Sequence, residues 1–157
     1  MKITNIETFS IPPRWLFVKI STDEGISGWG EPVLEGRVPT VEKAVAELSE
    51  HLLGRDPLHI LDHWQSMYLG EFYRGCGILM SAIAGLDQAL WDIKGKYHNV
   101  PVYKLLGGPI RDRIWIYTHI LGDDPASVTR DALAKKKQGF TAFKTNVGYS
   151  AGYLTKP

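Results

Sequence analysis

Residues 78–97 read "ILMSAIAGLDQALWDIKGKY", and the architecture expected for the first part of the chain follows from this stretch. Its apolar residues recur at the 3.6-residue period of an α-helix, which predicts one long helix with a wide apolar face. Small residues such as Gly85 and Ala89 lie among them, so a neighbouring element can pack closely. The apolar face consists of Leu79, Ala82, Ile83, Leu86, Leu90 and Ile93.

Three short β-rich patterns precede this helix and predict an antiparallel hairpin with a third strand. Two prolines separate the first pattern from the second, which places Arg14 and Trp15 on a bend or loop. Gly28 and Gly30 flank Trp29 in the third pattern and indicate a bulge or a close backbone approach. The three patterns are residues 3–11, 16–20 and 26–32.

Two further helices are predicted between the strands and the long helix. Thr40 is the expected N-cap of the first, whose apolar positions continue to Leu52 and which Gly54 ends. The second covers residues 58–68 and follows an Asp-Pro start signal. Its expected apolar side consists of Ile60, Leu61, Trp64, Met67 and Tyr68.

The pattern changes near residue 110 to an alternation of strand and helix. "RIWIYTHI" at 113–120 and "TAFKTN" at 141–146 are predicted strands, and the segment between them is a predicted helix with Pro125 in its first turn. A helical connection of this length suits a crossover between parallel strands. We therefore expect an α+β domain over residues 1–110, a β-α-β unit over 111–146 and an unassigned tail over 147–157.

Composition excludes several classes of protein. The chain has 157 residues, of which 44% are hydrophobic and 22% charged, as in a globular protein with a buried core. A formal net charge of +1 gives no electrostatic basis for binding nucleic acid or an anionic membrane. Cys76 is the single cysteine, which rules out an internal disulfide and fits the reducing cytoplasm. We find no signal peptide and no apolar run of membrane-spanning length.

Several motifs in a fixed order carry a resemblance to a known family. They are "GWGEP" at 28–32, the long helix at 78–96, "PVYKLLGG" at 101–108 and "FKTN" at 143–146. In this order they resemble the enolase superfamily, within its mandelate racemase-like subgroup. The stretch "PPRWLFVKISTDEGISGWGEPVLEGR" is most similar to the beginning of that subgroup's sugar-acid dehydratases, above all those acting on galactonate.

The resemblance implies an enolase-like capping domain, made of an antiparallel sheet and helices, followed by the truncated start of a TIM-type β/α barrel. In such enzymes Mg²⁺ at the barrel mouth polarises the carboxylate of a sugar acid such as galactonate. A base then removes the adjacent proton, and loss of the β-hydroxyl yields a 2-keto-3-deoxy acid. The acidic metal ligands come from later barrel strands, so this chain alone is expected to hold no metal.

Lys144 and Asn146 are the expected catalytic residues. They lie two positions apart near a strand end, so their side chains share one face where barrel sites form. The family pattern here is often Lys-x-Lys, with the second lysine as a base, and Asn146 cannot accept that proton. The resemblance therefore implies that both residues stabilise carboxylate or enolate oxygens while a later histidine acts as the base. The alternative is that Lys144 is only a solvated residue at a strand end.

Four other residues are candidates for binding the substrate. His119 shares a predicted strand face with Tyr117, and some sugar-acid dehydratases place a substrate-binding histidine there. Arg14, Trp15 and Arg37 lie on predicted cap loops, which close over the substrate in this family. Guanidinium and indole groups suit a polyhydroxylated anion. The alternatives are a packed or surface histidine, and a core Trp15 beside a solvated Arg14.

The length leaves three functional interpretations. A closed eight-stranded barrel needs about 250 residues, so the chain alone is expected to be inactive as a dehydratase. The competing interpretation is a non-catalytic interaction or regulatory module, which forms a homo-oligomer or pairs with a full-length homologue through its open barrel edge. A racemase or cycloisomerase of the same superfamily is a further alternative, against which Asn146 argues.

Overall fold

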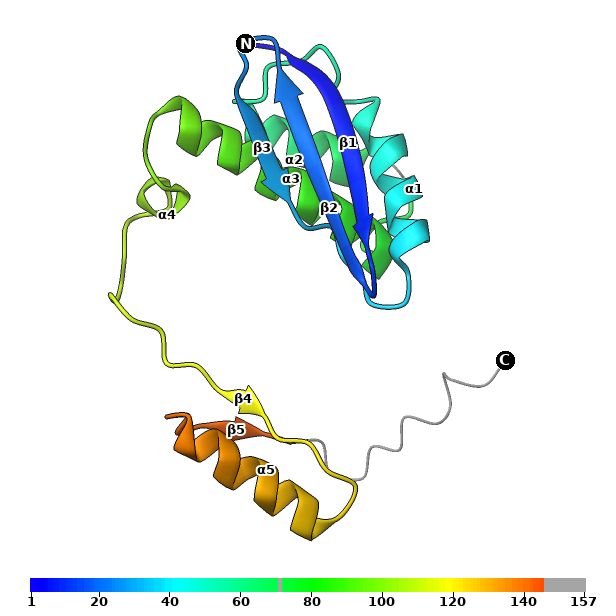
Figure 1. Ribbon diagram of the computed structural model, residues 1–157. Helices are drawn as coiled ribbons and strands as arrows, with labels where there is room; N and C mark the ends of the chain where they lie inside the picture. The colour runs from blue at the N-terminus through cyan, green and yellow to red at the C-terminus, as the bar shows by residue number, and fades with distance from the viewer. Residues whose placement is uncertain (71, 146–157) are drawn as a thin grey trace. The chain divides into compact units, whose positions relative to one another are not determined.

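A computed structural model describes residues 1–70 and 72–145 (Figure 1). The chain divides into two compact units, Met1–Pro109 and a second unit that begins at Ile110. Among the described residues, the first unit contains a three-stranded sheet and four helices, and the second contains two short strands and one helix.

The sheet of the first unit is antiparallel, with the order β1-β2-β3. Its strands are β1 (Ile3–Ile11), β2 (Trp15–Thr22) and β3 (Ser27–Gly30). Ile11 pairs with Trp15 across the hairpin. Trp15 therefore begins β2, and its predicted position on a loop is wrong, whereas Arg14 does lie in the turn. Three residues are enough to reverse the chain, which leaves Trp15 free to join the ladder.

Helix α3 (Gly77–Tyr97) packs against the sheet through β3 (Figure 1). A Cβ atom added to Gly28 would lie 2.0 Å from the carbonyl oxygen of Ala89, and one added to Gly30 would lie 1.9 Å from that of Gly85. These separations are far below van der Waals contact, so only glycine permits this spacing of strand and helix. The predicted close backbone approach at the two glycines is confirmed.

Helices α1 (Val38–Ser49), α2 (Ile60–Leu69) and α4 (Val102–Leu105) complete the first unit. Arg37, not Thr40, is the N-cap of α1, because Pro39 occupies the first turn and lets the helix begin earlier than predicted. In α2 the predicted apolar side is wrong at Leu61, which is exposed, while His63 is buried. His63 reaches inward because its Nε2 atom lies 2.7 Å from the carbonyl oxygen of Asp56.

The core of the first unit lies between the sheet and the helices. Alternate residues of β2 are fully buried on the face toward α3, as the period-two pattern requires. The predicted apolar face of α3 is buried except for Leu79, which is half-buried near the start of the helix. Within the described residues, no helix combines the length and apolar character needed to cross a membrane.

Asp87 on α3 makes the stability of the first unit depend on pH. Burial raises the pKa of Asp87 above its ordinary value of 3.8. Burial costs stability only when the carboxylate is ionised, so the cost is absent below the ordinary pKa and grows as pH rises through the folded-state pKa. We expect Asp87→Asn to raise the melting temperature by about 2 °C at pH 7 and to leave it unchanged at pH 3.

Thermal denaturation followed by circular dichroism at both pH values measures this effect. Asp123→Asn is the matched control, because Asp123 is exposed. A gain in melting temperature that is the same at pH 3 and pH 7 would show that the ionised carboxylate is not the cause.

The second unit is a β-α-β arrangement. Its elements are β4 (Thr118–His119), α5 (Pro125–Lys137) and β5 (Phe143–Lys144). The strands pair in parallel, with Thr118 opposite Phe143 and His119 opposite Lys144. Both are shorter than predicted, because the backbone ladder reaches only from the amide of Thr118 to that of Ile120. Residues 113–117 therefore have a strand-like pattern without a partner strand among the described residues.

Helix α5 begins with a capping box. The side chain of Asp124 accepts hydrogen bonds from the amides of Ala126 and Ser127, each at 2.8 Å. The Ser127 hydroxyl in turn lies 3.2 Å from the amide of Asp124. Pro125 occupies the first turn, as predicted.

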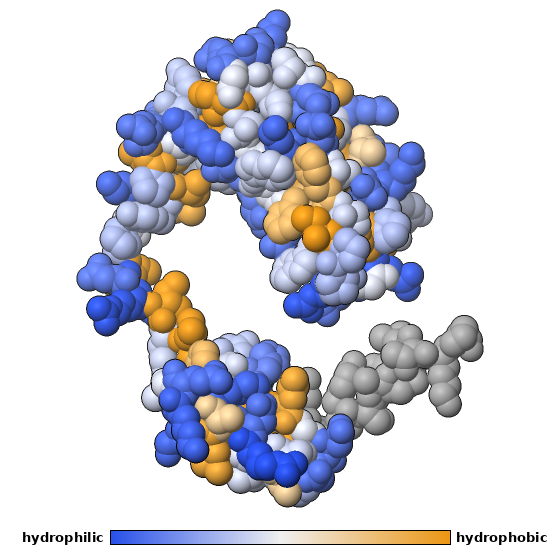
Figure 2. All heavy atoms as spheres, viewed as in Figure 1, coloured by the Kyte–Doolittle hydropathy of each residue, from blue (hydrophilic) through white to orange (hydrophobic). Residues whose placement is uncertain are grey.

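Large apolar side chains remain at the surface of the second unit (Figure 2). Ile114 and Trp115 are each 78% exposed, although the sequence pattern resembles that of a core strand. An apolar surface of this kind is typical of a face that another element covers. The other members are Ile110, Ile116, Tyr117, Leu121, Leu133 and Phe143.

Candidate functional site

Three side chains meet at the ends of the two parallel strands of the second unit. His119 and Lys144 are register partners, so their side chains lie on one face of the β4-β5 sheet. The Tyr117 ring links them: its centroid is 5.9 Å from that of His119 and 5.8 Å from the Lys144 Nζ atom. An ammonium group, an imidazole and a phenol hydroxyl are all donors for an oxyanion. We call these three residues the strand-end cluster.

The structure thus brings together two of the predicted site residues and adds a third. Tyr117 was expected to share the strand face of His119, but it was not predicted as a site residue. Its period-two spacing was the available signal. Asn146, predicted to act with Lys144, lies outside the described residues. Trp115 precedes β4 and donates its indole N–H to the Thr141 hydroxyl at 3.0 Å.

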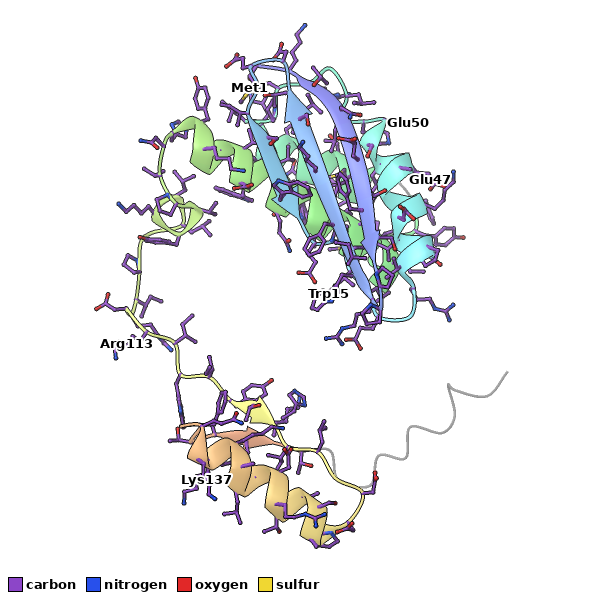
Figure 3. The ribbon with its side chains drawn as sticks, in the orientation of Figure 1. Met1, Trp15, Glu47, Glu50, Arg113 and Lys137 are labelled. Carbon is purple, nitrogen blue, oxygen red and sulfur yellow. The ribbon has the colours of Figure 1, made fainter. Side chains whose placement is uncertain are left out.

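Trp15 lies at the end of the β1-β2 hairpin in the first unit (Figure 3), and Arg14 precedes it in the turn. The Arg14 guanidinium carbon is 5.0 Å from the centroid of the Trp15 ring, and the guanidinium pairs with the carboxylate of Glu35. Both charged side chains are largely exposed. Glu35 was not predicted as a site residue, because nothing in its local sequence indicates a partner 21 positions away.

Arg37 lies in the same loop as Glu35. It is exposed, and its amide donates to the carbonyl oxygen of Leu34 at 2.9 Å. The same residue is the N-cap of α1, so its backbone is held while its side chain reaches solvent. Arg14, Trp15, Glu35 and Arg37 are called the cap-loop residues below.

Other charged residues tie elements together. The Asp92 carboxylate accepts from the amide of Trp29 at 3.0 Å and from Lys96 at 2.7 Å, and Lys96 also donates to the carbonyl oxygen of Ser27 at 2.7 Å. This network joins α3 to β3, and Asp92 therefore has a structural role. Among residues 1–70 and 72–145, no three histidine, cysteine or acidic side chains are grouped so as to hold a metal ion.

Comparison with known proteins identifies the family. Residues 6–107 match the model for the mandelate racemase / muconate lactonizing enzyme, N-terminal domain. The chain belongs to this family. The expected membership of the enolase superfamily, in its mandelate racemase-like subgroup, is confirmed, as is the α+β capping-domain fold.

Individual relatives of this mandelate racemase-like chain are sugar-acid dehydratases. It is 59% identical over its whole length to the D-galactonate dehydratase of Variovorax paradoxus strain S110, and covers 41% of that protein. It is 60% identical over 146 residues to the D-galactonate dehydratase of Ralstonia nicotianae, covering 93% of this chain and 38% of the relative. The chain thus spans about two fifths of the length of these curated relatives.

A solved structure supports the same assignment. An enolase from Pantoea ananatis, crystallised with D-gluconate and Mg, superposes with a TM-score of 0.86 at 39% identity. The match covers 92% of this chain and 36% of that enzyme. It therefore extends past the 6–107 range of the family model into the second unit.

Proposed function

We propose that the chain forms the capping domain and the first β-α-β unit of a D-galactonate dehydratase. In this proposal residues 1–110 are the cap and residues 111–146 begin the barrel. The observation that supports it most strongly is the 59% identity to the Variovorax enzyme across all 157 residues, including those of the strand-end cluster's segment. Identity at this level over both units favours a shared reaction over a shared fold alone.

The proposed reaction removes water from the sugar acid. A base takes the proton from C2, and the C3 hydroxyl leaves with a proton as water, so the enol product becomes a 2-keto-3-deoxy acid. Negative charge develops on the carboxylate oxygens as the C2 proton leaves. Fixed donors near those oxygens lower the barrier, because they stabilise the charge that grows in the transition state.

The strand-end cluster supplies such donors. Lys144 provides a full positive charge, while His119 and Tyr117 provide hydrogen bonds to carboxylate or hydroxyl oxygens. We assign Asn146 to the same face from its spacing, as a neutral donor that does not act as the base. The base and the ligands of the Mg²⁺ expected of the full-length enzyme are assigned to later barrel strands, as the resemblance to the family implies.

The cap-loop residues are proposed to recognise the rest of the sugar acid. Arg14 and Arg37 suit its hydroxyl oxygens, and the Trp15 ring suits the apolar face of the carbon chain. In the structure the Arg14 guanidinium is already paired with the Glu35 carboxylate. The substrate must therefore share Arg14 with Glu35 or displace Glu35. Arg14 thus favours ligands that bind it more strongly than an exposed ion pair does.

A chimeric enzyme tests the proposed function. This chain replaces the matching segment of the Variovorax D-galactonate dehydratase, and formation of 2-keto-3-deoxygalactonate is measured with D-galactonate and Mg²⁺. We expect turnover within about tenfold of the Variovorax enzyme, because the replaced segment provides only part of the site. The 157-residue chain alone is expected to give none.

Controls separate failure of function from failure to fold. Circular dichroism and size-exclusion chromatography establish that the chimera is folded, and D-gluconate serves as a competing substrate. A folded chimera that turns over neither acid would contradict the proposal. Turnover of D-gluconate but not of D-galactonate would support the proposed dehydration and contradict the proposed substrate.

A second candidate function, pairing with a full-length homologue or with another copy, is favoured by the exposed apolar residues of the second unit. Such residues, beside a two-stranded sheet with open edges, suit the addition of strands from another chain. Light scattering of the chain, alone and mixed with the Variovorax enzyme, distinguishes a monomer from either complex.

We also place the chain in the cytoplasm. Its single cysteine, Cys76, is exposed and free. An oxidising compartment would expose this thiol to intermolecular disulfide formation, whereas the cytoplasm keeps it reduced.

A further inference from the structure

We propose that Asp131 and Lys135 on α5 form a clamp that positions the end of β4 and, through it, the ring of His119 for the substrate anion. The two residues are called the α5 clamp. Their role depends on the proposed function, because it assumes that His119 binds the sugar acid. Lys135 reaches the backbone carbonyl of His119, and Asp131 holds Lys135, so we treat both as positioning residues.

The clamp holds the backbone directly after the strand. The Lys135 Nζ atom donates to the backbone carbonyl of His119 and, at 2.7 Å, to the Asp131 carboxylate. The same carboxylate oxygen accepts the amide of Leu121 at 2.7 Å. One ion pair on the helix therefore satisfies a carbonyl and an amide that lie two residues apart at the strand end.

This support matters because β4 is short. Its ladder to β5 includes the amides of Thr118 and Ile120, which donate to the carbonyl oxygens of Ala142 and Lys144 at 3.1 and 2.9 Å. The ladder therefore fixes the two residues on either side of His119. The clamp fixes the carbonyl of His119 itself, and the backbone direction there sets where the imidazole points.

The charged groups of the clamp, the Lys135 ammonium and the Asp131 carboxylate, form an ion pair. Lys135 is half-buried, with 22% of its side chain exposed, and its ammonium group faces the Asp131 carboxylate and the His119 carbonyl. The hydrogen bond from Lys135, and then that from the Leu121 amide, lower the pKa of Asp131. The clamp is therefore intact above the ordinary pKa of Asp131 and is lost as pH falls through the lowered value.

This arrangement gives two lysines different roles. Lys135 reaches the strand end from the helix, and its ammonium group is hydrogen-bonded to the His119 carbonyl and the Asp131 carboxylate. Lys144 reaches the same strand end from β5 and lies over the Tyr117 ring, where its charge is available to a ligand. Loss of Lys135 should therefore disturb the placement of His119, whereas loss of Lys144 should remove a substrate contact.

Nuclear magnetic resonance of the 157-residue chain tests the clamp without any enzymatic assay. We expect the Leu121 amide shift to titrate with Asp131, at a midpoint below that of an ordinary aspartate. Asp131→Asn should abolish the titration, and Lys135→Met should move its midpoint upward and shift the His119 ring signals. Lys136→Met is the matched control, because Lys136 is the next residue and is exposed. A Leu121 amide that ignores Asp131 would overturn the clamp.

Kinetics of the chimera test whether the clamp serves the site. We expect Lys135→Met to lower kcat/KM for D-galactonate by about tenfold, a size usual for residues that orient a binding group. Lys135→Arg should restore most of the loss, and Lys136→Met should have no effect. If the amide titration is as expected but Lys135→Met keeps wild-type kcat/KM, the positioning role is wrong while the proposed function stands. If the chimera is inactive with every variant, the proposed function fails, and the titration alone decides whether the clamp exists.

Discussion

Gly30→Ala is expected to lower the free energy of unfolding of the first unit by about 3 kcal/mol. The added methyl group would lie 1.9 Å from the carbonyl oxygen of Gly85 and 2.8 Å from its carbonyl carbon. Both atoms belong to the backbone of α3, so no side-chain rotation relieves the overlap. Strand and helix must separate, and the core between them loses contacts along its length. Domains of this size are stable by about 5–15 kcal/mol, so the loss is a large fraction of the total.

Urea denaturation followed by tryptophan fluorescence measures this change as a lower midpoint with an unchanged slope. Gly77→Ala is the matched control, because a Cβ atom at Gly77 would meet only a Leu34 methyl group, at 3.9 Å, at the start of α3. The control should be neutral or slightly stabilising, since alanine favours the helix. Equal midpoints for Gly30→Ala and the wild-type chain would show that the sheet and α3 are not packed at this spacing.

The packing at Gly30 could be anticipated because its causes are local. Two glycines flanking Trp29 in a strand, and small residues at helical spacing in α3, indicate close approach from their own neighbours in sequence. The start of α1 could not be read in the same way. Thr40 has the side chain of an N-cap, but Pro39 before it already fits the first turn, so the helix begins at Val38. The preference of threonine for the N-cap position therefore did not decide where α1 begins, because Pro39 already lies within its first turn.

The candidate site also combines features that the sequence predicts with features that only the fold reveals. The shared face of Tyr117 and His119 follows from period-two spacing, and the position of Lys144 beside them follows from a parallel β-α-β order. The pairing of Arg14 with Glu35 and the tie from Lys135 to His119 join residues far apart in sequence, so they depend on the fold. Residues 113–117 have the sequence pattern of a strand but do not form one in the structure. A strand also needs a partner strand, and a sequence pattern does not show whether one is present.

Lys144→Met in the chimera is the functional change with the largest expected effect. Methionine keeps the length and apolar stem of lysine but removes the positive charge that Lys144 gives to the strand-end cluster. If Lys144 stabilises the carboxylate oxygens as the C2 proton leaves, kcat/KM for D-galactonate should fall by about 10²–10³-fold, the usual cost of losing one such donor. Most of the loss should be in kcat, because the interaction strengthens as negative charge develops.

Steady-state kinetics of Lys144→Met beside Lys137→Met distinguish this role from that of a solvated strand-end lysine. Lys137, in the last turn of α5, is exposed and carries the same charge, so its loss tests the effect of net charge alone. Activity of Lys144→Met within a few-fold of the unmodified chimera would remove Lys144 from the site. A rise in KM with unchanged kcat would instead keep it as a contact that binds substrate and transition state equally. Tyr117→Phe, which removes only the hydroxyl, then shows whether Tyr117 also donates to the anion or only holds the Lys144 and His119 side chains beside its ring.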